Sequence, residues 1–379
     1  MPIATSSFKR YLALLSLAVT GCSSDGTTST VHPLQKELRN LEAGATAIIR
    51  PDTAPPAEMN EEAASRWRLT RRAILDARPG PVLGSFDEDG PAVFATHVAV
   101  TLGSGGRTHV LDAMSGRVVE FDSAGRFMSE FGRVGDGPME FRTPRDIDAW
   151  GDSLLVTQDG RVKVFHRSAS EYVPRDHLPV QIPLYSICPL DGNVFASVQR
   201  QPNAPLARYD LQTLTPARSF GRGYPSGPDL VRARLSLGPV ACVEDPARVV
   251  HGYQYLPGLN AYTPQGDQAW SAFLSDYMEG KWTYTAAGWL ETPIGAKETL
   301  TNLVTTSSGF VVASYFRADE SARRTSRVYL VDASTGHGAL IEETDAPDRE
   351  IMAIAEDRYV TYVIGPYPRL RIWYMDDPE

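Results

Sequence analysis

Short segments in which apolar and polar residues alternate recur along most of this chain, and turn residues separate them. Between Phe131 and Phe165, a glycine-rich stretch leads into a short segment that we expect to be a strand ending near Ile147. Gly151-Asp152 and Asp159-Gly160 then turn into SLLVTQ and RVKVF. Short strands joined by Gly-Asp and Asp-Gly turns are typical of an antiparallel meander. The pattern therefore predicts one unit of an antiparallel sheet.

The unit recurs at a regular spacing. Equivalent apolar strand ends at Phe121, Phe165 and Tyr209 are 44 residues apart. Three further copies end at Tyr262, Leu330 and Trp373. A period near 44 residues with about four strands in each unit is the sequence signature of a β-propeller blade. We therefore predict an all-β fold, a six-bladed β-propeller of four-stranded antiparallel blades.

One segment carries a family resemblance. GRVGDGPMEFRTPRDI resembles the blade-start signature of the NHL-like and TolB-like six-bladed propellers, in which a glycine cluster precedes Phe, Pro and an aliphatic residue. The matching residues here are Gly132, Gly135, Gly137, Phe141, Pro144 and Ile147. Met139 stands where the family usually has glycine. The resemblance implies the propeller fold but no chemistry, since a scaffold of this kind hosts many functions.

A propeller is commonly closed by a strand from the other end of the chain, because closure removes the free sheet edges that promote aggregation. Trp67-Arg68-Leu69 is placed to pair with the last blade around Tyr362–Met375. The alternative is a helix over Glu61–Leu75, where good helix formers accompany apolar residues at helical spacing. Both interpretations are compatible with the propeller.

The N-terminus resembles that of a bacterial lipoprotein. Lys9 and Arg10 precede an apolar run of nine residues, which is too short to span a bilayer and predicts a signal peptide over residues 1–21. Val19-Thr20-Gly21-Cys22 resembles a lipobox, although Val replaces the usual Leu, and the resemblance implies that Cys22 carries the lipid. The expected location is extracytoplasmic and lipid-anchored, at the outer membrane if the host is Gram-negative. The alternative is an ordinary signal peptide in which Cys22 has no role.

The next segment is rich in Ser, Thr, Pro and Ala, a composition that cannot bury a core. We predict a flexible tether over residues 22–60, with a short helix within 32–43, and the propeller over residues 61–379. The net charge of the chain is −9, and loss of Lys9 and Arg10 with the signal peptide makes it −11. Such a charge argues against nucleic acid as a partner. Arg323, Arg324 and Arg327 form a local basic cluster that we interpret as a solvated hairpin loop.

Two cysteines remain after Cys22. Cys188 and Cys242 occupy similar places in neighbouring repeats, and in an oxidising compartment they could form a disulfide. Because propeller blades diverge from the axis, equivalent positions could also lie farther apart than the 7 Å or so that a disulfide allows between Cα atoms. Two separate buried thiols are the alternative.

No catalytic motif is present: the sequence contains no Gly-Xaa-Ser-Xaa-Gly, no phosphate loop and no His-Glu-Xaa-Xaa-His. The seven histidines are scattered, and His97 and His251 are more typical of strand or surface residues than of metal ligands. Six-bladed relatives include lactonases that bind Ca²⁺ near the axis, but no residue here can be matched to their ligands. We therefore predict no catalytic residues, no metal ligands and no cofactor.

The repeat is interrupted once. The fourth and fifth copies are 68 residues apart, and the excess maps to residues 275–293, which contain Tyr277, Trp282, Tyr284 and Trp289. Loops on rigid scaffolds carry function more often than the scaffold does, so these aromatics are candidate ligand contacts. The alternative is that they pack the insert onto the propeller. The sequence favours a binding or scaffolding module for a protein, peptide or glycan over a propeller hydrolase or lyase with a metal in its central channel.

Overall fold

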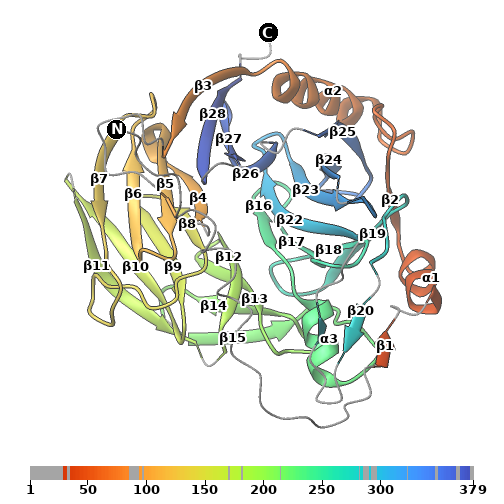
Figure 1. The fold of residues 1–379 in the computed structure, drawn as a ribbon, viewed down its shortest axis with the longest axis horizontal. Helices are drawn as coiled ribbons and strands as arrows, with labels where there is room; N and C mark the ends of the chain where they lie inside the picture. Colours follow the sequence, from red (N-terminus) through yellow and green to blue (C-terminus); the bar gives the residue numbers. More distant parts are fainter. Residues whose placement is uncertain are drawn as a thin grey trace, which may run out of the picture.

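The structure is a computed structural model that describes residues 29–31, 35–84, 94–95, 98–169, 171–180, 182–213, 215–280, 282–284, 290–291, 297–321, 323–345, 349–363 and 368–375. Six four-stranded antiparallel blades stand in a ring around a central axis (Figure 1). The first strands of successive blades contact one another in cyclic order, and the first strand of blade 6 contacts that of blade 1. The predicted six-bladed propeller is therefore confirmed.

Blade 1 consists of β4 (Val98–Gly103), β5 (Arg107–Asp112), β6 (Arg117–Phe121) and β7 (Phe127–Phe131). Blade 2 consists of β8 (Ile147–Trp150), β9 (Ser153–Gln158), β10 (Arg161–Ser168) and β11 (Glu171–Pro179). Blade 3 consists of β12 (Leu184–Leu190), β13 (Asn193–Val198), β14 (Leu206–Asp210) and β15 (Thr215–Phe220). Blade 4 consists of β16 (Val240–Val243), β17 (Arg248–Gly252), β18 (Gly258–Tyr262) and β19 (Gln268–Leu274). Blade 5 consists of β22 (Lys297–Thr305), β23 (Phe310–Ala318), β24 (Arg324–Asp332) and β25 (Gly338–Thr344). Blade 6 consists of β26 (Glu350–Ile354), β27 (Arg358–Val363), β28 (Arg369–Tyr374) and β3 (Arg78–Leu83).

The six sequence repeats correspond to the third strands of the six blades, β6, β10, β14, β18, β24 and β28. One boundary differs from the prediction: Ile147 begins β8 and does not end a strand. The glycine-rich stretch before it is a loop that wraps around Phe141, which is fully buried and packs against Phe165 at 5.5 Å between ring centroids. Gly132 has a φ of +95°, and a Cβ there would lie 2.4 Å from the Phe141 ring, so both conformation and space favour glycine.

A buried lysine fixes the same loop. The ammonium group of Lys163 on β10 donates hydrogen bonds to the carbonyl oxygens of Gly137 at 2.6 Å and Pro138 at 3.2 Å, and to that of Glu140. Its side chain is only 4% exposed, and burial lowers the pKa of the ammonium group. Because three carbonyl groups depend on one side chain, the blade-start signature has a structural role here.

The ring is closed by a different segment from the one predicted. Residues Glu61–Leu75 form helix α2, whose N-terminus is capped by Asn60 through a 2.8 Å hydrogen bond from the Ala63 amide. Trp67 is buried on the apolar face of this helix, and its indole nitrogen donates to the Leu330 carbonyl at 3.2 Å. The closing strand is β3, which pairs with β28. The principle of closure was predicted correctly, but Trp67-Arg68-Leu69 is helical because its apolar positions have helical spacing.

The segment predicted as a flexible tether over residues 22–60 is partly structured. It contains β1 (Ser29–Val31), α1 (Gln35–Ala43) and β2 (Ala47–Arg50). Strand β2 pairs in parallel with β19 of blade 4 and β25 of blade 5, which joins these two blades into one nine-stranded sheet. Ile49 is fully buried there. The strand Ala47–Arg50 was not predicted because it is short and the average composition of residues 22–60 is polar.

The predicted signal peptide, residues 1–21, and Cys22 lie outside the described residues. Within the described part of the chain, no helix is long and apolar enough to cross a membrane.

Candidate functional site

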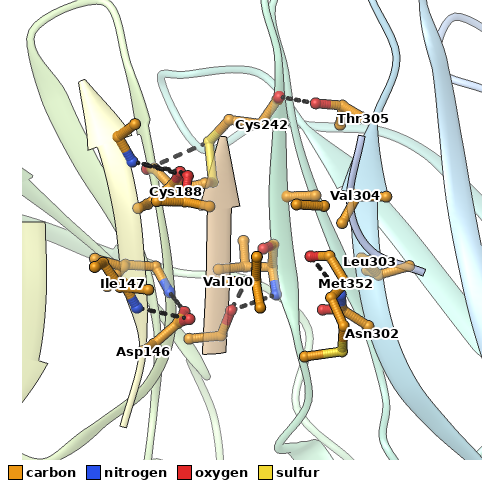
Figure 2. Close-up of a pocket in the computed structure, with 18 of the residues that line it drawn as sticks. Val100, Asp146, Ile147, Cys188, Cys242, Asn302, Leu303, Val304, Thr305 and Met352 are labelled. Carbon is orange, nitrogen blue, oxygen red and sulfur yellow. Dashed lines mark hydrogen bonds between the residues drawn. A yellow bond between two sulfur atoms is a disulfide. The ribbon is translucent and has the colours of Figure 1, made fainter. Parts of the chain in front are cut away.

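A central channel of about 240 Å³ runs between the first strands of the six blades. Each blade contributes residues to its wall from β4, β8, β12, β16, β22 or β26, as Figure 2 shows in close-up. Among them are Thr101, Asp148, Ser186, Cys242, Asn302 and Met352. Because all six blades contribute to this channel, it is the best candidate for a functional site in the described part of the chain.

Two carboxyl groups from β8 and the residue before it line this channel. Asp146 accepts hydrogen bonds from the backbone amides of Ile187 at 2.8 Å and Ile147 at 2.9 Å. Asp148 accepts from the Thr101 hydroxyl at 3.0 Å and from the amide of Ala149 at 2.8 Å. Because alternate residues of a strand point to the same side, Asp146 and Asp148 both belong to the channel wall.

Their environment favours the neutral acid. Burial raises the pKa of Asp146 to about 6, although its hydrogen bonds oppose the shift. Burial and then the nearby charge of Asp146 raise the pKa of Asp148 to about 7. Among the described residues, no basic side chain acts on either pKa. The pair therefore titrates near neutrality, a property that is concentrated in binding and catalytic sites.

Two further ionisable groups lie near the same end of the channel. Glu350 begins β26, and burial raises the pKa of its carboxyl group, opposed by a hydrogen bond with Thr301. Burial raises the pKa of Tyr185 on β12 to about 12; the charge of Arg234 opposes this shift, and the charges of Asp146 and Glu350 add to it. With three carboxyl groups and one guanidinium group among these residues, this mouth of the channel is predominantly acidic and rich in hydrogen-bonding groups.

The structure joins Cys188 and Cys242 in a disulfide with an S–S distance of 2.04 Å. They lie on β12 and β16, the first strands of adjacent blades, and their Cα atoms are 5.5 Å apart. Blades diverge with distance from the axis, so equivalent positions on the first strands are the ones that stay within reach. The disulfide forms part of the channel wall (Figure 2).

The insert that interrupts the repeat is attached to the propeller through Tyr277. This side chain packs against the core between blades 4 and 5, and its hydroxyl donates to the Glu298 carbonyl at 2.8 Å. Burial raises the pKa of Tyr277 well above its usual value. Trp282 and Tyr284 lie on β20 (Trp282–Tyr284), which pairs with β21 (Leu290–Glu291). Trp289 lies outside the described residues.

A buried ionic network anchors the start of the insert. Glu298 accepts hydrogen bonds from Arg327 at 3.1 Å, from Arg317 at 2.8 Å and from the Met278 amide at 2.8 Å. Arg327 also binds Asp276. Arg327 is only 1% exposed, so its interpretation as part of a solvated hairpin loop is wrong. Its guanidinium group can be buried because acidic partners surround it.

The histidines do not converge on the axis in the described structure. His251 is fully buried on β17, a second strand, and burial lowers its pKa to about 4. His97 lies outside the described residues. Among the residues with described positions, no group of three or more His, Cys, Asp or Glu side chains could hold a metal ion.

Sequence reasoning missed Asp146 and Asp148. They are part of the segment that we interpreted as blade-start geometry. The available signal was the alternation Asp-Ile-Asp shortly after Pro144 at the start of a first strand. The missing information was which strand of the blade faces the axis.

Comparisons with known proteins support the fold. A family model described as a 6-bladed β-propeller, DUF5128, matches residues 99–212. This range extends from the second residue of β4 to just after β14. No curated protein matches the chain in sequence. A member of the DUF4221 family from Bacteroides vulgatus superposes with a TM-score of 0.51 at 10% identity, over 79% of this chain and 98% of that one. A protein of unknown function from Bacteroides thetaiotaomicron gives a TM-score of 0.50 at 11% identity, over 77% and 72% of the two chains. At these identities the likeness concerns the fold, and the chain is a six-bladed β-propeller.

Proposed function

We propose that this protein is a lipid-anchored, extracytoplasmic binding module that holds a group of its ligand at the acidic mouth of the central channel. The observation that carries the proposal is the pair Asp146 and Asp148, two carboxyl groups in a channel built by all six blades, on which no basic side chain of the described part of the chain acts. Buried acidic groups without an internal cation favour a ligand that supplies one, or that supplies hydrogen-bond donors.

The size of the channel limits the ligand. About 240 Å³ is below the range of roughly 300–1,000 Å³ that is usual for small-molecule pockets. A protein, peptide or glycan would therefore insert only one group, such as a lysine or arginine side chain or an amino sugar, and would make its other contacts around the mouth. Tyr277 is already committed to the core, whereas Trp282, Tyr284 and Trp289 stay candidate contacts in the insert.

The proposed location rests on the N-terminal sequence. A basic start, an apolar run and Cys22 in a lipobox-like setting support export and lipid attachment. The disulfide between Cys188 and Cys242 is consistent with an oxidising compartment. Fatty-acid labelling that is lost in Cys22→Ser would support this location, and labelling that persists would refute the site.

The test of binding uses the lipidated protein solubilised in detergent. We expect the wild type to retain a ligand carrying a basic or hydrogen-bond-donating group through purification, and Asp146→Asn/Asp148→Asn to lose it. The matched control is Asp136→Asn, which changes an exposed aspartate that pairs with Arg142 on the protein surface. Equal retention of the ligand by all three proteins would exclude the channel as the binding site.

A second candidate function has the same residues as its basis. Carboxyl groups with pKa values of about 6 and 7 are suited to general acid and base roles near neutral pH, as a hydrolase or lyase requires. A channel metal would find oxygen ligands in Asp146 and Asp148. Stoichiometric Ca²⁺ or Zn²⁺ in the purified mature protein, lost in the Asp146→Asn/Asp148→Asn variant, would favour the enzyme over the binding module.

A further inference from the structure

The N-terminal segment is attached to one particular side of the propeller. Strand β1 pairs antiparallel with β20 of the insert, with Ser29 opposite Tyr284 and Val31 opposite Trp282. Strand β21, the other partner of β20, lies beside helix α3 (Asp229–Ser236), and Figure 1 shows α3, β20 and β1 next to one another. We call β1, β20, β21 and α3 the anchor side.

The next element strengthens this attachment. Leu38 and Leu41 of α1 pack against the apolar cluster that contains Val231 and Leu235 of α3 together with Tyr253. Strand β2 then pairs with both blade 4 and blade 5. From Ser29 onward, three successive elements of the N-terminal segment are bound to the propeller, so the described part of this segment is held close to the propeller.

The anchor side and the acidic mouth lie at the same end of the channel. In a blade of four antiparallel strands, the fourth strand ends at the level where the next blade's first strand begins. The insert connects β19 to β22, and α3 lies in the connection from β15 to β16, so both belong to that end. Asp146 directly precedes β8 and belongs to it too.

Only a short stretch of chain lies between Cys22, the proposed site of the lipid, and β1, the first strand attached to the propeller. Only six residues separate Cys22 from Ser29, and seven residue steps at full extension span at most about 25 Å. A free tether over residues 22–60 would instead allow roughly 130–140 Å. This difference decides whether the propeller has a fixed orientation or tumbles at a distance from the bilayer.

We propose that the anchor side lies against the phospholipid headgroups of the membrane that holds the Cys22 lipid. The inference rests on the proposed lipid attachment, and it names a second contact that the lipid alone would not impose. Strand β20, which β1 pairs with, carries Trp282 and Tyr284, and Trp and Tyr are the residue types that favour the membrane–water interface. The acidic mouth then faces the membrane, and its ligand is one that is present at the bilayer surface.

A cross-link tests the pairing on which the inference depends. Thr30 and Thr283 are register partners, so Thr30→Cys/Thr283→Cys is expected to form a disulfide in the full-length lipidated protein. The matched control is Thr30→Cys/Glu291→Cys, because Glu291 is opposite Thr283 on the far strand of the same sheet and is two strands away from Thr30. Equal cross-linking of the two pairs, or none in either, would overturn the inference.

A second experiment tests the orientation on the membrane. A fluorophore is attached to Asp229→Cys at the start of α3 or to Glu244→Cys in the turn after β16, at the opposite end of the channel; both positions are exposed. The lipidated proteins are reconstituted into vesicles of phosphatidylethanolamine and phosphatidylglycerol that contain a headgroup nitroxide. We expect strong quenching at position 229 and little at position 244.

The outcomes separate the two proposals. Equal quenching at the two positions, in protein that carries fatty acid on Cys22, would overturn the orientation and leave the anchor intact. Protein without fatty acid on Cys22 would overturn the anchor, and the orientation with it. Strong quenching at position 244 alone would show that the opposite side faces the membrane and would also overturn the inference.

Discussion

Replacing Asp148 by Asn is expected to stabilise the protein above neutral pH. Asn keeps the side-chain oxygen that accepts from Thr101 and from the Ala149 amide but cannot become charged. The pKa of Asp148 is raised from 3.8 to about 7, and each tenfold change in proton affinity corresponds to about 1.4 kcal/mol. The whole difference in proton affinity therefore amounts to ~4 kcal/mol. Because the Asp148 side chain is only partly buried, we expect about half of that value.

The sign follows from proton linkage. The folded state holds the Asp148 proton more tightly than the unfolded state, so the wild type loses stability as the pH rises from about 4 to about 7. Asp148→Asn lacks this loss. The two proteins are therefore expected to have similar melting temperatures near pH 4, and the variant is expected to melt a few degrees higher above pH 7.

The assay is thermal unfolding of both proteins across this pH range. Asp136→Asn, at an exposed position, is the control and should follow the wild type within the small contribution of a surface ion pair. In Asp146→Asn burial still raises the pKa of Asp148 but the charge of Asp146 no longer adds to it, so the pH-dependent loss of stability should be smaller and should end at a lower pH. Parallel curves for the wild type and Asp148→Asn would refute the assignment of a raised pKa to this carboxyl group.

Three further predictions concern stability. Reduction of the disulfide, or Cys188→Ser/Cys242→Ser, should destabilise the protein by up to ~4 kcal/mol, because the bond closes a loop with a sequence separation of 54; an unchanged melting temperature with and without reductant would contradict this. Arg327→Met should cost up to about 3–5 kcal/mol in denaturant titration, because it removes one of the two guanidinium groups that neutralise the buried Glu298 and leaves only Arg317. Arg323→Met, at an exposed ion pair, should change the stability little. Lys163→Met should lower stability by ~1–3 kcal/mol and increase proteolysis in the blade-start loop, and resistance equal to the wild type would argue against its role.

The sequence was most informative about the third strands. Each third strand lies between two others in its blade, and residues such as Val118, Val162 and Leu330 are almost completely excluded from solvent. Burial on both faces gives such strands apolar ends that recur with the blade period, so six copies could be aligned without a structure. Periodicity reports how a strand is buried, and this information was sufficient for the fold.

The same signal says little about the first strands, which build the candidate site. Strands β8 and β16 have only four residues each, and the side chains of β8 are mostly half-buried because they border a channel. Asp146 and Asp148 therefore look like turn or surface residues in the sequence. Their shared environment arises from closure of the ring, which brings together six strands far apart in sequence, and no local pattern encodes that contact.

The N-terminal segment was difficult for a related reason. Strand β2 is only four residues long, three apolar and one basic, and the sequence around it is polar. It is buried because it pairs with the edge strands of blade 4 (β19) and blade 5 (β25). The helix over Glu61–Leu75 was one of two open interpretations, and its amphipathic spacing was the correct guide.

The position of β2 also affects the order in which the molecule can be assembled. Ile49 pairs opposite Gly338, which lies 289 positions further along the chain, so synthesis must pass through blades 1 to 4 before this contact can form. Such a contact has a high loop-closure cost and forms late. Among the described residues, those of β2 are therefore synthesised early but complete their contacts late. Until blade 5 exists, Ile49 can pair only with Leu274 of blade 4, and the apolar face of α2 has no core to enter, so the nascent chain is expected to depend on holding factors during that interval.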